Sequence, residues 1–167
     1  MRDLSRIYGK LTVTVFAEDG SVKIRVVNHN IVTSEGDALV ADLMSETPAR
    51  TKLDNSSGKI VLGTGWTGST PKANAYVNSA TGSPQAMEAT YPKLKGTFGN
   101  TDDNVVQYRA IFEAGDLNDT GIDEAGLGNN AAEASGDNLA YAQITPTVDV
   151  TTSDTLQVDW EITLLGA

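Results

Sequence analysis

Oxygen-bearing side chains alternate along one acidic segment of the chain in a pattern that could bind calcium. Asp116, Asn118 and Thr120 occupy the first, third and fifth positions of a calcium-loop pattern. Gly121 occupies the sixth position, where such loops turn sharply, but Leu127 stands at the twelfth, where a glutamate would bind the ion with both oxygens. A solvated acidic turn gives the same pattern. We therefore expect no obligatory cofactor, with an irregular calcium site as the alternative.

The other residues that could do chemistry are isolated from one another. The chain has no cysteine and one histidine, His29, so the sequence indicates neither a thiol nucleophile nor a zinc site. Asp159 and Glu161 share one face of a predicted strand, as paired carboxylates of a glycosidase could, but any solvated strand face alternates in this way. The glycines of residues 63–65 lack the lysine and the following helix of a phosphate-binding loop. We expect no catalytic residues and no enzyme.

Candidate contacts with a partner lie at the amino end and in the polar loops. Arg2, Arg6 and Lys10 make the first ten residues mildly basic, which suits docking on an acidic partner. Trp66 and Tyr76 are aromatic residues in sequence rich in glycine, serine and threonine, and aromatic side chains anchor many interfaces. For Trp66 the alternative is a buried side chain.

The length and composition of the chain predict that all these candidate residues belong to a single domain. The 167 residues contain no apolar run long enough to cross a membrane and no secretory leader, so we expect a soluble product that starts in the cytoplasm. The net charge of −10 is uneven: residues 1–30 carry +2, residues 31–95 carry 0 and residues 96–167 carry −12. The acids either keep a β-rich surface soluble or turn away from a docking surface. A nucleic-acid groove is not expected, because it would need clustered lysines and arginines.

A hairpin is predicted near the amino end. Residues 11–17 and 22–26 alternate apolar and polar side chains on either side of the Asp-Gly pair at 19–20, which suits a two-residue type I′ turn. With this turn, all the apolar side chains fall on one face. The resulting register pairs, from the turn outward, Ala17 with Val22, Val15 with Ile24 and Val13 with Val26.

The closing segment, Thr155 to Leu165, alternates without a break and is the clearest strand in the sequence. A helix is expected from Thr33 or Ser34 until before Pro48, and Pro146 marks an edge or a bulge. Further strands are expected at residues 60–62, 105–112, 139–144 and 147–150, with a polar loop at 113–138. Residues 64–103 form either a long polar surface loop or a hairpin whose register the sequence does not define. These elements predict an all-β, single-domain β-sandwich over residues 11–167, with a jelly roll as one candidate topology, one short helix, long polar loops and an N-terminal arm of residues 1–10.

Several short motifs follow one another from Asn30 to the C-terminus. They are Asn30-Ile31-Val32-Thr33 with Gly36; Ile60-Val61-Leu62-Gly63-Thr64-Gly65; Val106, Tyr108, Arg109, Ala110 and Phe112 with Ala114, Gly115, Asp116 and Asn118; Ile122, Glu124, Gly126 and Leu127; and the closing Thr155, Leu156, Val158, Trp160, Ile162 and Thr163. This succession resembles small structural proteins of tailed bacteriophage virions, especially those that decorate heads or sit on necks and tails. The motifs are short and apolar.

The resemblance implies a non-enzymatic virion protein made in the host bacterial cytoplasm. It implies a head decoration, or cement, protein that binds the outer capsid surface and stabilises the shell, with the major capsid protein and other copies of itself as partners. No nucleic acid, membrane or cofactor is implied. Within virions the alternative is a tail, collar, neck or fibre component. From another class, the alternative is a carbohydrate-binding module that uses Trp66, Tyr76 and Tyr91 as a stacking platform.

Overall fold

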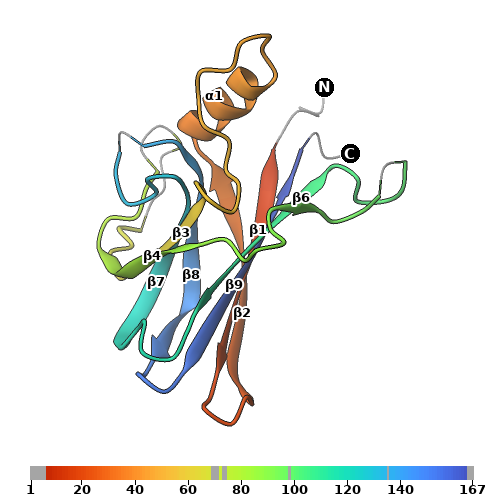
Figure 1. Cartoon of the computed structure of the whole chain (residues 1–167). Helices are drawn as coiled ribbons and strands as arrows, with labels where there is room; N and C mark the ends of the chain where they lie inside the picture. Colours follow the sequence, from red (N-terminus) through yellow and green to blue (C-terminus); the bar gives the residue numbers. More distant parts are fainter. Residues whose placement is uncertain (1–6, 69–71, 73–74, 98, 135, 165–167) are drawn as a thin grey trace.

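The computed structural model describes residues 7–68, 72, 75–97, 99–134 and 136–164. In this part of the chain, nine strands form one antiparallel sheet, and a short helix, α1 (Ser34–Leu43), lies at one end of it (Figure 1). The strands are β1 (Tyr8–Phe16), β2 (Val22–Val32), β3 (Lys59–Gly63), β4 (Ala80–Ala86), β5 (Lys93–Leu94), β6 (Val105–Phe112), β7 (Asp119–Gly128), β8 (Asn138–Val150) and β9 (Thr155–Thr163).

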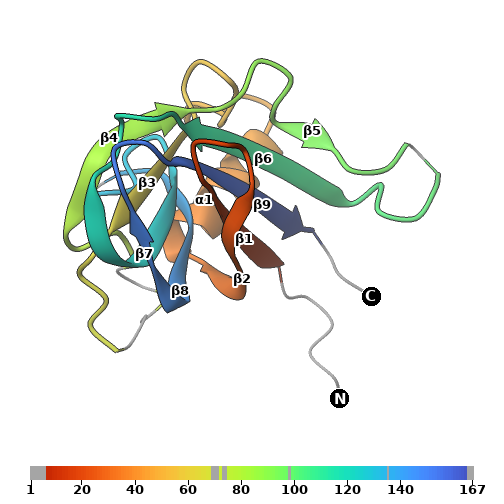
Figure 2. The same cartoon turned by 90° about the horizontal axis from the view of Figure 1, so that it is seen from below.

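The sheet curls so that its two halves enclose one core. The hydrogen-bonded strand order is β4-β3-β7-β8-β2-β1-β9-β6-β5, and the view in Figure 2 shows the curl. The two sides of the sheet approach each other where the backbone N–H of Glu88, just beyond β4, donates to the carbonyl of Arg109 in β6 at 2.9 Å. The prediction of an all-β single domain with one short helix is confirmed. The two layers of the predicted sandwich are the two halves of one curled sheet.

The closing strand supplies the centre of this core, as its alternation predicts. Along β9 every second side chain is buried, and the largest of them, Trp160, has none of its surface exposed. Its indole N–H donates to the side-chain oxygen of Asn30 at 2.8 Å, which gives the buried ring its polar partner. The core therefore ties β9 to β2, which lies two strands away across β1.

The predicted hairpin register is confirmed for Val15 with Ile24 and for Val13 with Val26, but the predicted pair of Ala17 and Val22 is wrong, because the register shifts after Val15 and Val22 pairs with Phe16. The turn is different: the N–H of Ala17 donates to the carbonyl of Ser21, and the N–H of Gly20 donates to the carbonyl of Ala17. In the turn only Gly20 has a positive φ, of 80°. A type I′ turn needs a positive φ at both central residues, which here would include Asp19. The chain instead uses a three-residue turn with a bulge, in which Asp19 keeps a negative φ.

The first strand begins earlier than predicted. β1 starts at Tyr8, so Lys10, which we assigned to an N-terminal arm, lies within the sheet. Residues 8–10 pair with the end of β9, and Gly9 makes this possible because a Cβ there would lie 2.6 Å from the carbonyl oxygen of Glu161. Arg2 and Arg6, the other basic residues of the predicted arm, lie outside the described residues.

The loop predicted for residues 113–138 is wrong, because β7 runs through its centre. This glycine-rich strand has little intrinsic strand preference, but it pairs with β3 on one side and β8 on the other. Glycine is required at Gly126, where a Cβ would lie 2.7 Å from the side chain of Ala131. Tertiary packing therefore decides the structure of this segment against its local composition.

The helix and the bulge predicted at Pro146 are confirmed. α1 begins after Thr33, whose hydroxyl accepts the N–H of Gly36 at 2.9 Å as an N-cap. The β7–β8 register shifts between Ile122, opposite Val148, and the next paired residue, so Pro146 lies in the bulged part of β8. The polar segment predicted for residues 64–103 contains the edge strands β4 and β5.

Candidate interaction surface

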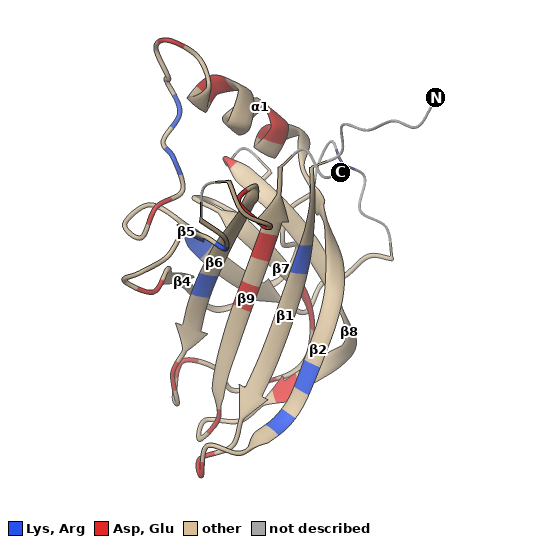
Figure 3. Cartoon of the chain, turned by 90° about the vertical axis from the view of Figure 1, so that its right-hand side faces the viewer, with Lys and Arg blue, Asp and Glu red and all other residues tan. Residues whose placement is uncertain are grey.

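The outer face of β2, β1, β9 and β6 carries its charges in stripes (Figure 3). Asp159 and Glu161 follow each other along β9 on this face. Strand pairing places Lys10 of β1 beside Glu161, and Arg109 of β6 beside Asp159. An acidic strand therefore runs between two basic ones, and we refer to this outer face of the four strands as the striped face.

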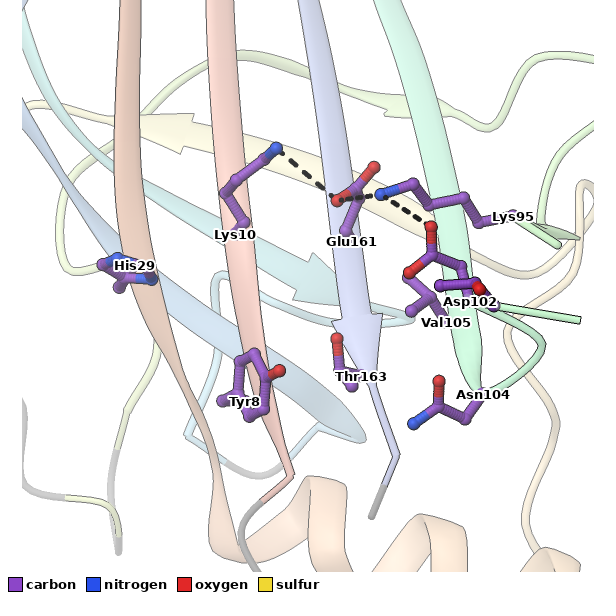
Figure 4. A pocket seen from close by; sticks show the side chains of 10 residues that line it. Tyr8, Lys10, His29, Lys95, Asp102, Asn104, Val105, Glu161 and Thr163 are labelled. Carbon is purple, nitrogen blue, oxygen red and sulfur yellow. Dashed lines mark hydrogen bonds and ion pairs between the residues drawn. The ribbon is translucent and has the colours of Figure 1, made fainter. Parts of the chain in front are cut away.

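Glu161 is the centre of a charge network on the striped face (Figure 4). The Nζ atoms of Lys10 and Lys95 lie 3.6 and 3.4 Å from its carboxylate, and the side-chain amide of Gln107 donates to it at 3.0 Å. Partial burial works to raise the pKa of Glu161, but the Gln107 bond and the two lysines outweigh it and lower the pKa. Burial likewise opposes the charge of Lys95, yet Glu161 and Asp102 raise its pKa. Both shifts favour the charged forms of Glu161 and Lys95.

The carboxylate of Asp159, two residues before Glu161 on β9, is likewise bound by a cation and by a side-chain amide. The Nε of Arg109 lies 2.6 Å from its carboxylate, and Gln157 donates to the other oxygen at 2.6 Å. The guanidinium of Arg109 also lies 5.0 Å from the ring of Tyr91, with Lys93 at 4.5 Å from that ring. A glycosidase pair needs one protonated carboxyl. The striped face instead holds both carboxylates as ion pairs.

A shallow hollow of about 380 Å³ lies at the end of the striped face nearest the start of β1 (Figure 4). Its wall includes Tyr8, whose side chain is 49% exposed, together with His29, Asn104 and Thr163. The hollow offers hydrogen-bond donors and acceptors, one phenol ring and the charged groups of Lys10, Lys95 and Glu161. This mixture of polar, charged and aromatic groups is of the kind found where protein side chains contact one another.

Towards the hairpin turn, the striped face presents an unpaired cation beside an apolar side chain. Lys23 donates to Asp154 at 2.7 Å, whereas Arg25 is exposed and forms no ion pair with any described residue. Val27, two residues along the same face of β2, is 56% exposed. An exposed apolar residue next to a free positive charge is a typical element of a protein interface.

The aromatic residues proposed as partner contacts, Trp66 and Tyr76, are only partly exposed. Trp66 is partly buried and stacks on Tyr141 of β8, with ring centroids 5.7 Å apart and an interplanar angle of 22°. Tyr76 is also partly buried. Tyr91 is only 8% exposed and lies against Arg109 of β6. Tyr91 therefore offers almost no surface to the stacking platform predicted for a carbohydrate-binding module, whereas Trp66 and Tyr76 each keep part of their surface exposed.

The acidic segment proposed for calcium leads into a strand. Asp116 accepts the N–H of Glu113 at 2.9 Å within a turn, and Thr120 already belongs to β7. Asn118 lies between them, immediately before the strand. Among the described residues, no group of three or more acidic or histidine side chains is arranged to hold a metal ion.

One buried carboxylate, that of Glu124, accepts a group of hydrogen bonds that the sequence does not predict. Glu124 of β7 has none of its surface exposed, and its oxygens accept the backbone N–H groups of Gly65, Asn78 and Ser79, each at 3.0 Å. The hydroxyl of Tyr141 donates to it as well. The glycine-rich segment thus surrounds an anion, as phosphate loops do, but the anion belongs to the chain itself.

The glycines of this segment are explained by the same carboxylate. A Cβ on Gly63 would lie 2.6 Å from a carboxylate oxygen of Glu124, and a Cβ on Gly65 would lie 2.9 Å from it. Burial, followed by the bond to Glu124, raises the pKa of Tyr141. The only sequence pattern that pointed here was a glycine-rich turn after a buried strand, because Glu124 comes from a segment 59 residues further along the chain.

Comparison with protein families, curated protein sequences and solved structures gives no match for this chain. No helix of the described residues has the length and apolar character needed to cross a membrane. The function is therefore inferred from the charges and contacts of the surface.

Proposed function

We propose that this chain is a structural protein of a bacteriophage virion, which binds the outer surface of the capsid through its striped face and stabilises the shell. The observation that carries the proposal is Arg25, which has no ion-pair partner among the described residues, beside the exposed Val27 on a face whose other charged side chains form ion pairs. The resemblance of the short motifs to virion structural proteins supports the same function.

The pairing of charges gives the face a defined pattern without making it strongly positive. Ion pairs on an exposed surface contribute little stability to the fold, but they fix where each charge lies. A partner with a complementary pattern could then dock in a single register. Arg25 would meet an acidic group, and Val27 would be covered by apolar atoms.

On a shell, this interaction would be repeated on many symmetry-related subunits. The binding of one copy would be modest, but contacts that bridge neighbouring subunits add together, since release of a subunit would require several contacts to break. The major capsid protein and neighbouring copies of this chain would be the partners. This is how a small β-domain would resist separation of the shell.

The experiment is re-binding of purified protein to virions of the source phage that lack it. Replacing Arg25→Glu and Val27→Asp together should strongly reduce the bound amount, because one change reverses a charge at the contact and the other buries a carboxylate. The matched control is Lys52→Glu, a charge reversal at an exposed lysine in the loop between α1 and β3. Equal binding of both variants would contradict the proposed surface.

The alternative place on the virion is the tail, collar, neck or a fibre. Quantitative mass spectrometry of intact virions separates the two by copy number relative to the major shell subunit. A ratio near one, or a simple fraction of one, supports head decoration. A ratio of a few per cent places the protein on the tail, the neck or a vertex.

A further inference from the structure

An apolar groove of about 250 Å³ lies between α1 and the ends of the strands beneath it. Figure 1 shows α1 at the end of the sheet where β1 begins and β9 finishes. The groove is bounded by side chains from α1, β6, β8 and the end of β9, none of which is charged. They are Val40, Leu43, Met44, Val106, Tyr108, Leu139, Ile162 and Leu164.

Two of these side chains are more exposed than an isolated domain favours. Met44 is 83% exposed and Leu43 is 38% exposed, although both lie beside buried core residues. The rest of the wall is half-buried or buried. An apolar side chain placed in the groove would cover the exposed pair and complete the packing over this end of the sheet.

The surroundings of the groove on the helix side are acidic. Glu46 follows Met44 by two residues and makes no hydrogen bond or ion pair with any described residue, and Asp42 lies beside Leu43. Arg50, the nearest following cation in the sequence, is paired with Asp137. The charges therefore favour an occupant that combines an apolar side chain with basic neighbours.

The start of the chain leaves the sheet beside this groove. Tyr8 pairs with Thr163, so Ile7 is level with Leu164 on the neighbouring strand, about 5 Å away. Both Ile7 and Leu164 pack against the core, and Leu164 forms part of the groove wall. Any segment that precedes Ile7 thus begins one strand from the groove.

We propose that residues 1–6 bind in this groove of their own chain. These residues lie outside the described part of the structure. Leu4 is three residues before Ile7, a reach of up to about 10 Å, and provides the apolar side chain. Arg2 and Arg6 lie two residues on either side of it and outnumber Asp3, so the segment is basic overall. The segment thus combines the apolar side chain and the positive charge that the groove favours, and it is short enough to bind there without leaving Ile7.

A second copy of the chain is the competing occupant, because its exposed Met44 could fill the groove. Such a dimer would bring two α1 helices together, and each carries Glu35, Asp37 and Asp42 with no basic residue in its last turn. Like charges would then face each other across the contact. The single-chain arrangement avoids this repulsion.

The test follows the methyl resonance of Met44 by NMR in the full chain and in variants. Leu4→Asn and deletion of residues 1–6 should shift this resonance towards the position of an exposed methionine, whereas the matched control Ser5→Asn should not, because it leaves Leu4 and the charges of the segment unchanged. Met87, buried in the core, reports whether each variant is folded. Adding a synthetic peptide of residues 1–7 to the deleted chain should reverse the shift.

Two results would overturn the proposal. In the first, the Met44 resonance is the same in the full chain, in Leu4→Asn and in the deleted chain. In the second, the resonance changes with protein concentration and sedimentation shows a dimer that Met44→Asp abolishes, which assigns the groove to a second copy. All these measurements use the isolated protein, so they are independent of whether the chain binds a capsid.

Discussion

At the residue scale, Glu124 shows how the chain retains a fully buried carboxylate. Burial of a charge is costly unless the charge is hydrogen-bonded, and here three backbone N–H groups and a tyrosine hydroxyl supply the bonds. Two of those N–H groups, of Asn78 and Ser79, come from the segment that precedes β4. The carboxylate therefore fixes a long connection to the sheet.

We expect Glu124→Gln to destabilise the protein by about 2 to 4 kcal/mol, because the amide nitrogen would face N–H donors that then lack an acceptor. Denaturant unfolding measures the loss. The control is Glu113→Gln, an exposed glutamate whose side chain makes no bond to any described residue. Acrylamide should also quench Trp66 more strongly in the variant, while Trp160 stays protected. Equal stability of both variants would mean that the buried carboxylate is dispensable.

Asp154 provides a second residue-scale prediction, which concerns pH. Lys23 and the backbone N–H of Thr151 bond to its carboxylate and lower its pKa to about 2. A lowered pKa means that the ionised group stabilises the folded state above about pH 4 and that this contribution disappears as the pH falls towards 2.

We therefore expect Asp154→Asn to lower the free energy of unfolding by about 1 to 3 kcal/mol at neutral pH, because it removes bonds to a charged acceptor. The difference from the unmodified protein should shrink between pH 4 and pH 2 in chemical denaturation series. Glu18→Gln, on the adjacent hairpin turn, is the control and should show no such convergence. A difference that stays constant down to pH 2 would contradict the ion pair.

At the element scale, the strands that the sequence predicts are those whose pattern is local. β9 alternates along its whole length, and the first hairpin has a turn that sets its own register. β7 has neither property. Its glycines serve close packing against Ala131 and its neighbours, and this requirement exists only once β3, β7 and β8 are together. The sequence pattern therefore suggests a loop where packing builds a central strand.

The same distinction applies to the interaction surface. Lys10 could be selected from the sequence because a basic amino end is a local feature, although its place within β1 could not. Arg25 and Val27 were not selected, since their exposure depends on which face of the hairpin the rest of the sheet covers. Trp66 was selected for its residue type, and Tyr141, its stacking partner, comes from a strand far along the chain.

Gly126 gives the element-scale prediction. We expect Gly126→Ala to destabilise the protein by about 1 to 3 kcal/mol, because the added methyl would overlap the side chains of Ala131 and Val77. Thermal unfolding followed by circular dichroism measures the change. Thr120→Ala, at the exposed start of the same strand, should have a small effect. If the two variants melt alike, the close approach is not what requires glycine.

At the scale of the whole molecule, the net charge of −10 is unevenly distributed over the surface. Six of the ten basic residues in the described part of the chain lie on the striped face or on its edge at β5: Lys10, Lys23, Arg25, Lys93, Lys95 and Arg109. Most acids lie elsewhere. Long-range repulsion would therefore turn the acidic sides away from an acidic shell and leave the striped face as the side that can approach it.

This orientation predicts how salt should affect binding to virions that lack the protein. Raising the ionic strength shortens the range of exposed charges to less than about 8 Å, so the association rate should fall while the dissociation rate changes little. At low salt we expect Arg25→Glu to associate about threefold to tenfold more slowly than the unmodified chain, and the difference should narrow as salt is added. Surface plasmon resonance on immobilised virions measures both rates. If binding strengthened with salt, or if Lys52→Glu had the same effect as Arg25→Glu, the striped face would not be the docking side.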